Sequence, residues 1–197
     1  MLITVEGLDG AGKTTLVAGL AAALEQRGQP VLVLREPGGV EVSERIRELL
    51  KDPSLEIDPR TEALLYAAAR AQLVAEQLRP LLEGGTTVLL DRFVDSSLAY
   101  QGAGRELGVE AIRALNAFGT GGLTPDRTLL LRIDPEAGLG RIADREADRL
   151  EQEDTAFFSR VAAEYDTLAD AEPGRIAVID AAQPPDAVLA DALDALQ

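Results

Sequence analysis

The glycine-rich stretch GLDGAGKT, from Gly7 to Thr14, restricts the possible folds of this chain more than any other feature. It matches the pattern G-x-x-x-x-G-K-[ST], with the β-rich run LITVE before it and the helical spacing of TTLVAGLAAALEQRG after it. Glycines let backbone N–H groups close around phosphate oxygens, and the following helix N-terminus adds partial positive charge. The motif therefore predicts a strand, a phosphate-binding loop and a helix in direct succession.

Five β-rich runs alternate with amphipathic stretches along the chain. In order they are LITVE, PVLVLRE, TTVLLDR, RTLLLRID and RIAVID. A run such as PVLVLRE hardly alternates, which is typical of a strand buried on both faces. This order predicts a single α/β domain over residues 1–197, with a five-stranded parallel sheet flanked by helices on both faces. Its ligands should bind beyond the carboxyl ends of the strands.

Between these runs the spacing of apolar residues predicts helices. One long helix is predicted over 61–83, and two helical segments between Val94 and Phe118. The charge-dense stretch PEAGLGRIADREADRLEQED is predicted to be helical with a break.

Composition excludes several classes of function. The chain has 34 acidic and 19 basic residues, a formal charge of −15, so its surface should repel nucleic-acid polymers and anionic membranes. It has no cysteine and no histidine, which removes disulfides, thiolate nucleophiles and the commonest general base. The opening MLITVEG lacks a basic region and a cleavage pattern, and no apolar run reaches membrane-spanning length. These features predict a cytoplasmic enzyme or switch.

The phosphate-binding loop supplies candidates for a nucleoside triphosphate and its metal ion. The residues predicted to bind ATP are Gly7, Leu8, Asp9, Gly10, Ala11, Gly12, Lys13, Thr14 and Thr15. Lys13 would reach the terminal phosphates, and the Thr14 hydroxyl would help to hold Mg²⁺. Asp91, at the end of the run TVLLDR, would bind Mg²⁺ directly or through water. The alternative for Asp91 is a helix cap or an ion pair with Arg92.

The group that receives the phosphate has to be recognised by residues outside this loop. Tyr66 and Arg70 lie at positions i and i+4 of the predicted long helix, so they share one helix face. A ring beside a guanidinium suits a nucleobase, since one can stack and the other can donate hydrogen bonds. The alternative is a core tyrosine next to a solvated arginine, and periodicity by itself leaves both open.

Five motifs together resemble the thymidylate kinase family. They are EGLDGAGKTT, REPGG, LLYAAARAQL, DRFVDSSLAYQG and DRLEQED followed by FF and Y, and they extend from Met1 to about IDAAQP. The resemblance implies a P-loop nucleoside monophosphate kinase fold with a small mobile lid at about 137–153. It implies transfer of the γ-phosphoryl group of ATP to dTMP, giving dTDP and ADP, with Mg²⁺. It also implies a homodimer.

Site residues follow from the resemblance, position by position. Asp9 resembles the acidic residue near the metal and the acceptor phosphate, and Arg92 the arginine that grips the dTMP phosphate. Tyr66 matches the ring that stacks on thymine, and Arg70 the arginine that hydrogen-bonds the base. The remaining residues implied on the dTMP side are Ser97 and Gln101 near the base, Tyr100 against the 2′ position of the sugar, Glu36 and Pro37 in the acceptor loop, and Arg47, with Arg45 as an alternative, at the phosphate.

The family implies a catalytic arginine either in the phosphate-binding loop or in the lid. The loop interior, LDGA, has none, whereas Arg141, Arg145 and Arg149 recur at steps of four in the lid region, as on one helix face. Arg145 and Arg149 are the lid arginines predicted to act with Lys13, Asp9 and Arg92 in catalysis. The alternative is a solvated helix whose arginines pair with Glu and Asp.

Two other functions remain open at this level. One is another P-loop nucleoside or nucleotide kinase, and the other is a nucleotide-dependent switch ATPase that needs no acceptor. Tyr100 and the YAAAR stretch argue against the first, and Arg70 and Arg92 argue against the second.

Overall fold

The computed structural model describes residues 1–142 and 148–197. Its five strands are β1 Leu2–Gly7, β2 Val31–Arg35, β3 Thr87–Asp91, β4 Arg127–Arg132 and β5 Ile176–Asp180. They form one parallel sheet in the order β2-β3-β1-β4-β5. The predicted five-stranded parallel sheet is confirmed. The prediction that the strand in PVLVLRE is buried on both faces is wrong, because β2 lies at the edge of the sheet with Leu32 and Val33 exposed.

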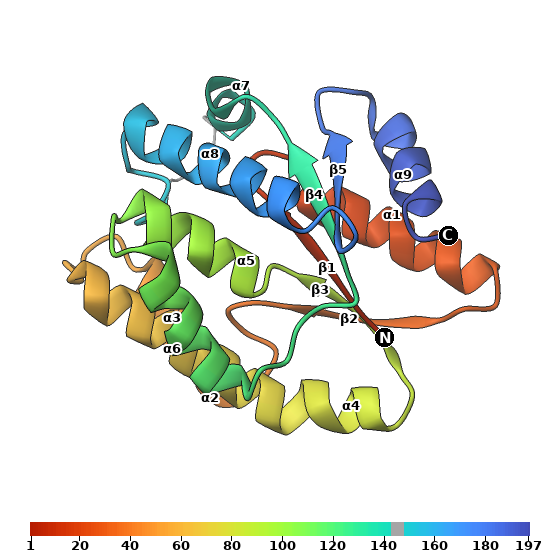
Figure 1. The fold of residues 1–197 in the computed structure, drawn as a ribbon, viewed down its shortest axis with the longest axis horizontal. Coiled ribbons are helices and arrows are strands. Elements are labelled where there is room, and N and C mark those ends of the chain that lie inside the picture. The colour runs from red at the N-terminus through yellow and green to blue at the C-terminus, as the bar shows by residue number, and fades with distance from the viewer. Residues whose placement is uncertain (143–147) are drawn as a thin grey trace.

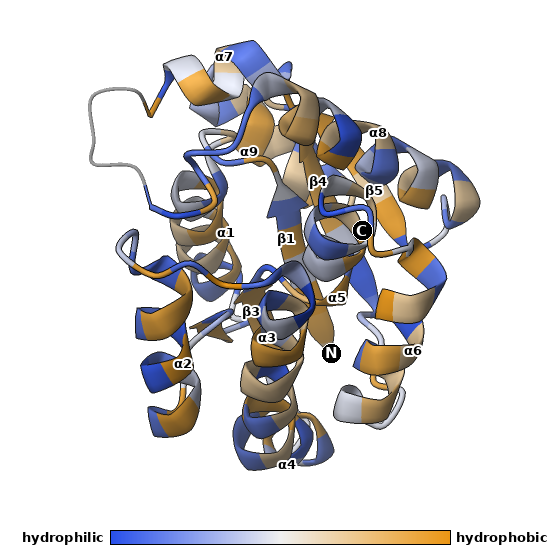
Figure 2. Ribbon diagram, turned by 90° about the vertical axis from the view of Figure 1, so that its left-hand side faces the viewer, coloured by the Kyte–Doolittle hydropathy of each residue, from blue (hydrophilic) through white to orange (hydrophobic). Residues whose placement is uncertain are grey.

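Helices connect the strands. Their bounds are α1 Lys13–Gln26, α2 Glu41–Lys51, α3 Pro59–Leu73, η1 Val74–Leu78, α4 Arg79–Glu83, α5 Val94–Ser97, η2 Leu98–Gly104, α6 Val109–Thr120, α7 Pro135–Gly140, α8 Thr155–Ala171 and α9 Pro185–Asp194. Figure 1 shows α1 and α9 on one side of the sheet and α8, α5 and α6 on the other. In Figure 2 both the strands and the helices around them show hydrophobic and hydrophilic stretches. No helix of the described residues is long and apolar enough to cross a bilayer.

Local sequence explains where several helices begin. Asp58 caps α3 by accepting from the backbone N–H groups of Arg60 and Thr61, and Pro59 occupies the first turn, where no N–H is needed. Asp154 caps α8 in the same manner, accepting from the N–H of Phe157 at 2.7 Å. Each cap fixes the direction in which its helix leaves the preceding loop.

The helix predicted over 61–83 begins two residues earlier and contains a wider turn. Between α3 and α4 the five residues of η1 form π-helical hydrogen bonds. Pro80 explains this turn, because proline has no N–H to donate to the carbonyl of Glu76 four residues before it. The two helical segments predicted between Val94 and Phe118 are confirmed, and the first of them continues into the π-helical η2.

Two apolar clusters hold the layers together. The larger packs Leu20 of α1 and Phe157 of α8 with strand residues such as Val5. The smaller lies under β3, where Leu73 packs with Leu90. Both clusters consist of side chains that are almost completely buried, so the sheet is a rigid platform for the loops at its carboxyl end.

Strand order places three loops side by side at that end. β3 lies between β2 and β1, and Asp91 is in register with Arg35 on one side and Val5 on the other. The phosphate-binding loop after β1, the Glu36–Pro37 loop after β2 and the Asp91–Arg92 pair after β3 therefore meet. The Glu36–Pro37 peptide bond is cis.

Candidate active site

A cavity of about 400 Å³ opens where these loops meet. On one side it is lined by Gly10, Gly12, Lys13, Thr14 and Thr15 of the phosphate-binding loop and α1. The opposite wall consists of residues that were all predicted from sequence on the acceptor side. They are Glu36, Pro37, Arg47, Tyr66, Arg70, Arg92, Ser97, Tyr100 and Gln101. Residues from distant parts of the chain thus share one cavity.

The phosphate-binding loop holds its lysine against its own backbone. Lys13 Nζ donates to the carbonyl oxygens of Gly7, at 3.2 Å, and Leu8, at 2.8 Å. Burial and the nearby charge of Arg92 lower the pKa of Lys13 to about 8, although Asp9 and Asp91 oppose the shift. A polyphosphate in the cavity would offer this cation better partners than two carbonyl groups.

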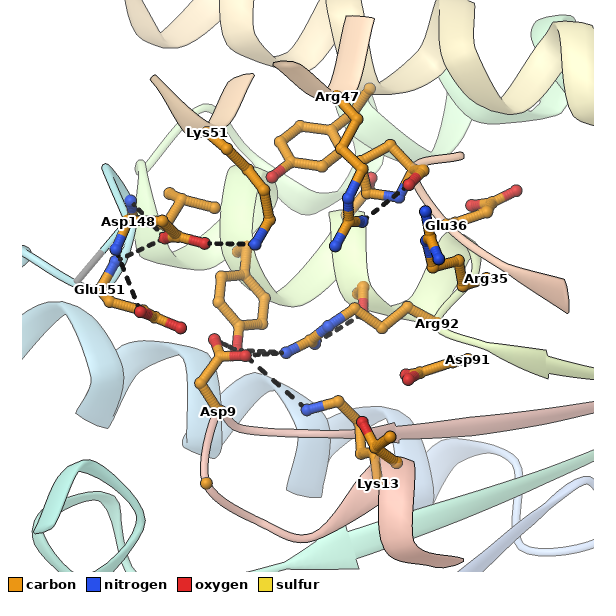
Figure 3. Close-up of a pocket in the computed structure, with 18 of the residues that line it drawn as sticks. Asp9, Lys13, Arg35, Glu36, Arg47, Lys51, Asp91, Arg92, Asp148 and Glu151 are labelled. Carbon is orange, nitrogen blue, oxygen red and sulfur yellow. Dashed lines mark hydrogen bonds and ion pairs between the residues drawn. The ribbon is translucent and has the colours of Figure 1, made fainter. Parts of the chain in front are cut away.

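Asp9 and Arg92 form the link between the two sides of the cavity. Arg92 Nη2 lies 2.7 Å from Asp9 Oδ1, and the Tyr100 hydroxyl donates to Asp9 Oδ2 at 3.0 Å. Burial by itself would raise the pKa of Asp9, but Arg92, Lys13 and Tyr100 outweigh burial and hold this pKa well below its ordinary value. Figure 3 shows Arg92 and Asp9 between Lys13 and Arg47.

Arg92 itself is held by residues that sequence reasoning missed. It is one of two described non-glycine residues in the left-handed region, with φ 69°. Its Nη1 donates to Ser96 Oγ at 3.1 Å, and Ser96 Oγ in turn donates to Glu6 Oε2 at 2.5 Å. Glu6 also accepts from the backbone N–H of Phe93 at 2.7 Å and from the hydroxyl of Tyr165 at 2.9 Å. Burial, followed by the charge of Asp95, raises the pKa of Glu6.

Arg70 lies at the centre of a second buried network. Nε donates to Glu36 Oε2 at 2.7 Å, Nη1 to Ser97 Oγ at 2.9 Å and to Asn116 Oδ1, and Nη2 to the carbonyl of Phe93 at 2.9 Å. A guanidinium has five N–H groups, so within the described residues one N–H of Nη2 is left for a ligand. Burial raises the pKa of Glu36 to about 7, against the opposing charge of Arg70.

Gln101 and Glu62 form a third contact beside the cavity. Gln101 Nε2 donates to Glu62 Oε1 at 2.9 Å. Glu62 also accepts from Arg105 at 3.0 Å, and Arg149 Nη2 lies 2.7 Å from its Oε2. Glu62 is fully buried. Sequence reasoning did not select it, although it precedes Tyr66 by four residues on the same helix face.

The structure separates the two arginines of α2. Arg47 lines the cavity and donates to the carbonyl of Pro37 at 2.7 Å, whereas Arg45 is exposed and pairs with Glu41 at 2.6 Å. Lys51, which was not selected from sequence, lies on the same wall and pairs with Asp148 at 3.1 Å. Of the two predicted alternatives, the geometry brings only Arg47 to the cavity.

The expectation that the lid arginines share one helix face is wrong for the described residues. α7 ends at Gly140, and Arg141 lies in a turn on the cavity wall. Residues 148–151 form a turn of their own, because the Asp148 carboxylate accepts from the N–H groups of Leu150 and Glu151. The Arg149 side chain extends from this turn to Glu62, with which it forms an ion pair, and donates to the carbonyl of Leu50. Arg145 lies outside the described residues.

The predicted metal-binding residues also reach the cavity. Thr14, Asp91 and Asp9 line it, and Asp91 Oδ1 is buried without a hydrogen-bond partner in the described part of the chain. A buried carboxylate oxygen without a donor is costly. It is therefore available to a cation or to the water molecules around one.

Comparison with known proteins finds similarity to thymidylate kinases over nearly the whole chain. The family model for thymidylate kinase matches residues 5–192. The thymidylate kinase of Deinococcus radiodurans is 54% identical over 192 residues, which are 97% of this chain and 93% of that protein. The one from Latilactobacillus sakei is 49% identical over 200 residues, 99% and 94% of the two chains. The crystal structure of thymidylate kinase from Ehrlichia chaffeensis has a TM-score of 0.81 at 30% identity, covering 100% of this chain and 98% of that chain.

Proposed function

The chain belongs to the thymidylate kinase family, and from this premise we propose how its residues divide the reaction between them. It is an ATP-dependent phosphotransferase that transfers the γ-phosphoryl group of ATP to dTMP and forms dTDP and ADP. This assignment of roles rests on the shared cavity, in which the phosphate-binding loop faces Arg92, Tyr66 and Arg70.

ATP binds on the side of the phosphate-binding loop. Backbone N–H groups from Gly7 to Thr15 surround its phosphates, with the N-terminus of α1 directed at them. Lys13 leaves the carbonyls of Gly7 and Leu8 and pairs with the terminal phosphates. Its charge then lies where negative charge moves during transfer.

The residues present fit a magnesium ion. Mg²⁺ is held in proteins through one or two carboxylates together with substrate phosphates, so a dedicated cage of ligands is unnecessary. Thr14 and Asp91 would hold it, Asp91 through its unpartnered Oδ1, with Asp9 close to the acceptor side. When bound, the ion would neutralise charge on the β- and γ-phosphate oxygens.

dTMP binds on the opposite side. Arg92 and Arg47 hold its phosphate, since both guanidinium groups reach the cavity and suit an anion. Tyr66 stacks on thymine, and Arg70, Ser97 and Gln101 contact its edge. Tyr100, which is fixed by Asp9 and Arg92, restricts the sugar at the 2′ position. Glu36 and Pro37 complete the wall.

Alignment and charge supply most of the catalysis. The phosphate of dTMP is already an anionic nucleophile, so the reaction needs no histidine or other general base. Asp9 and Arg92 keep the acceptor in line with ATP, and Lys13 and the lid arginine Arg145 neutralise the transferred group, whereas Arg149 is paired with Glu62. Closure of the lid at about 137–153 would exclude water, which would otherwise hydrolyse ATP.

A comparison of acceptors tests this function. ADP formation is measured with dTMP, dUMP, UMP, CMP and thymidine, and without acceptor. We expect the highest kcat/KM with dTMP and little ATP turnover without it. Equal rates with several monophosphates would indicate a different nucleotide kinase, and acceptor-independent turnover would indicate a switch ATPase.

Two copies of this chain pair through the layer of α2, α3 and α6. These helices lie next to one another on one side of the molecule (Figure 2). They expose Leu49, Leu64 and Phe118, the last with 90% of its surface accessible, and exposed apolar side chains on neighbouring helices suit an interface. We expect a cytoplasmic enzyme, because ATP is available there.

A further inference from the structure

We propose that Glu62 selects the base of the acceptor by fixing the orientation of the Gln101 side-chain amide. This inference rests on the proposed contact of Gln101 with the base. Glu62 does not line the cavity itself, so it acts as a positioning residue behind a residue that does.

The contact between these side chains admits one orientation of the amide. Glu62 Oε1 accepts from Gln101 at 2.9 Å, and a carboxylate can only accept. The NH₂ group of Gln101 must therefore face Glu62. Gln101 Oε1 is left toward the cavity, where it has no protein partner within residues 1–142 and 148–197.

The surroundings keep Glu62 in its accepting role. Arg105 Nη2 donates to Oε2 at 3.0 Å, and Arg149 Nη2 lies 2.7 Å from the same oxygen. Arg105 donates hydrogen bonds to both oxygens of this fully buried carboxylate, and the charge of Arg149 beside it further favours the ionised, accepting form. Gln101 is itself 2% exposed, so its amide has no room to exchange partners with solvent.

Arg70 supplies the complementary half of the recognition. After its four hydrogen bonds to Glu36, Ser97, Asn116 and Phe93, one N–H of Nη2 remains. The cavity thus presents one donor, from Arg70, and one acceptor, from Gln101. Thymine offers the matching edge, an O4 acceptor next to an N3–H donor. Uracil has the same edge, whereas cytosine has an amino donor next to an N3 acceptor.

One face of α3 carries three of the four residues of this arrangement, and Gln101 comes from η2. Glu62, Tyr66 and Arg70 are four residues apart, so they project from the same side of the helix. Tyr66 stacks on the ring, Arg70 donates to the edge, and Glu62 orients the amide that accepts from it. A reversed amide would instead place its NH₂ group against thymine N3–H, donor against donor.

The test compares Glu62→Gln with the wild type and with the control Glu153→Gln. Glu153 is the other carboxylate of Arg105, at 2.5 Å, so the control removes the same charge without touching Gln101. The readouts are kcat/KM for dTMP, dUMP and dCMP, with the melting temperature. A glutamine side chain can donate as well as accept, so in Glu62→Gln the Gln101 amide can flip. We therefore expect the preference for dTMP over dCMP to fall at least about fivefold. The preference for dTMP over dUMP should stay within about twofold, because both bases have the same edge.

Three results would overturn the proposal. They are a smaller change in the dTMP to dCMP preference, an equal change in Glu153→Gln, and a parallel loss of discrimination against dUMP. If Glu62→Gln does not fold, the charge-balanced pair Glu62→Gln with Arg105→Gln gives the same readout. If that variant also fails to fold, Gln101→Leu is measured instead. An unchanged preference for dTMP over dCMP would then show that the Gln101 amide does not take part in recognition of the base. Absence of dTMP turnover in the wild type would contradict the proposed function instead.

Discussion

Arg92 Nη2 lies 2.7 Å from Asp9 Oδ1, which joins the end of β3 to the phosphate-binding loop after β1. The side-chain relative accessibilities are 17% for Arg92 and 23% for Asp9, so the pair borders the cavity but is not solvated like a surface ion pair. An arginine in this position can face an acceptor phosphate while its partner acid stays beside the donor. The pair therefore connects the two sides of the cavity.

Replacing Arg92 should disable use of the acceptor. We expect Arg92→Ala to lower kcat/KM for dTMP at least about 100-fold, because an anionic substrate loses its charged partner. KM for ATP should change much less. Steady-state kinetics with each substrate varied in turn measure both. The control is Arg113→Ala, whose exposed arginine pairs with Glu110 away from the cavity, and normal dTMP kinetics in Arg92→Ala would refute the assigned role.

Ser96 should act through Arg92. Its hydroxyl connects Arg92 to Glu6, so Ser96→Ala should raise KM for dTMP about three- to tenfold while KM for ATP stays near the wild-type value. In an Arg92→Ala background the same change should have little further effect on dTMP kinetics. Tyr165→Phe removes a hydroxyl that contacts Glu6 and Ser96 Oγ but not Arg92, and should have a smaller effect. Additive effects of Ser96→Ala and Arg92→Ala would argue for independent roles.

Nucleotide binding should depend on the charge of Lys13. The pKa of Lys13 is about 8 in the ligand-free protein, so its charge is present below pH 8 and is lost as pH rises through that value. Bound phosphates favour the charged form and raise this pKa. ATP affinity should therefore fall above pH 8, and binding at pH 8 should take up about half a proton. Calorimetry of MgATP binding in buffers of different ionisation enthalpy measures the uptake, which should nearly vanish at pH 6. No uptake at pH 8 would contradict the prediction.

Two glycines of the phosphate-binding loop should differ in their effect on folding. Both have positive φ, 79° at Gly10 and 94° at Gly12, so alanine costs about 1–2 kcal/mol at either position. A Cβ on Gly10 would also lie 2.0 Å from the carbonyl oxygen of Gly138, whereas a Cβ on Gly12 meets nothing within 4 Å among the described residues. Gly10→Ala should lower the free energy of unfolding by at least about 3 kcal/mol, because α7 has to move. Urea denaturation measures the free energy of unfolding of both variants. Equal losses in the two would show that α7 can move away from residue 10 at little cost.

The exposed ring of Phe118 gives a test of the proposed dimer. We expect Phe118→Glu to shift the protein from dimer to monomer, because charge at an apolar interface is unfavourable. Sedimentation velocity of both proteins at several concentrations measures the change. Val178→Glu, an equally charged change at a 40% exposed residue of β5 outside this helix layer, is the control. A monomeric wild type, or a dimeric Phe118→Glu, would remove this layer as the interface.

Much of the fold was predictable because its signals are local. Apolar runs predicted all five strands, and GLDGAGKT predicted the loop between β1 and α1, since each signal lies within about a dozen residues. The region after α7 was predicted less well. Arginines at steps of four suggested one helix face, but the chain forms a turn at Asp148 whose side chain binds nearby N–H groups.

Residues with conspicuous chemistry were selected from the sequence, and residues that support them were not. Arg92 and Gln101 stand in recognisable motifs, whereas Glu6 and Glu62 look like ordinary members of a strand and a helix. Glu6 lies 90 residues from Ser96 and 159 residues from Tyr165 along the chain. Periodicity contains no information on such pairs.

The amino-acid sequence was enough to predict the succession of strands and helices along the chain, the phosphate-binding loop and, through five motifs, the family. The folded chain was needed to show that Arg47 rather than Arg45 reaches the cavity, that Arg149 turns to Glu62, and that the NH₂ group of Gln101 faces Glu62. Hydrophobic periodicity reflects only neighbours within a few turns of the same helix or strand. The direction of a polar side chain depends on hydrogen-bond partners that the strand order β2-β3-β1-β4-β5 brings from distant segments.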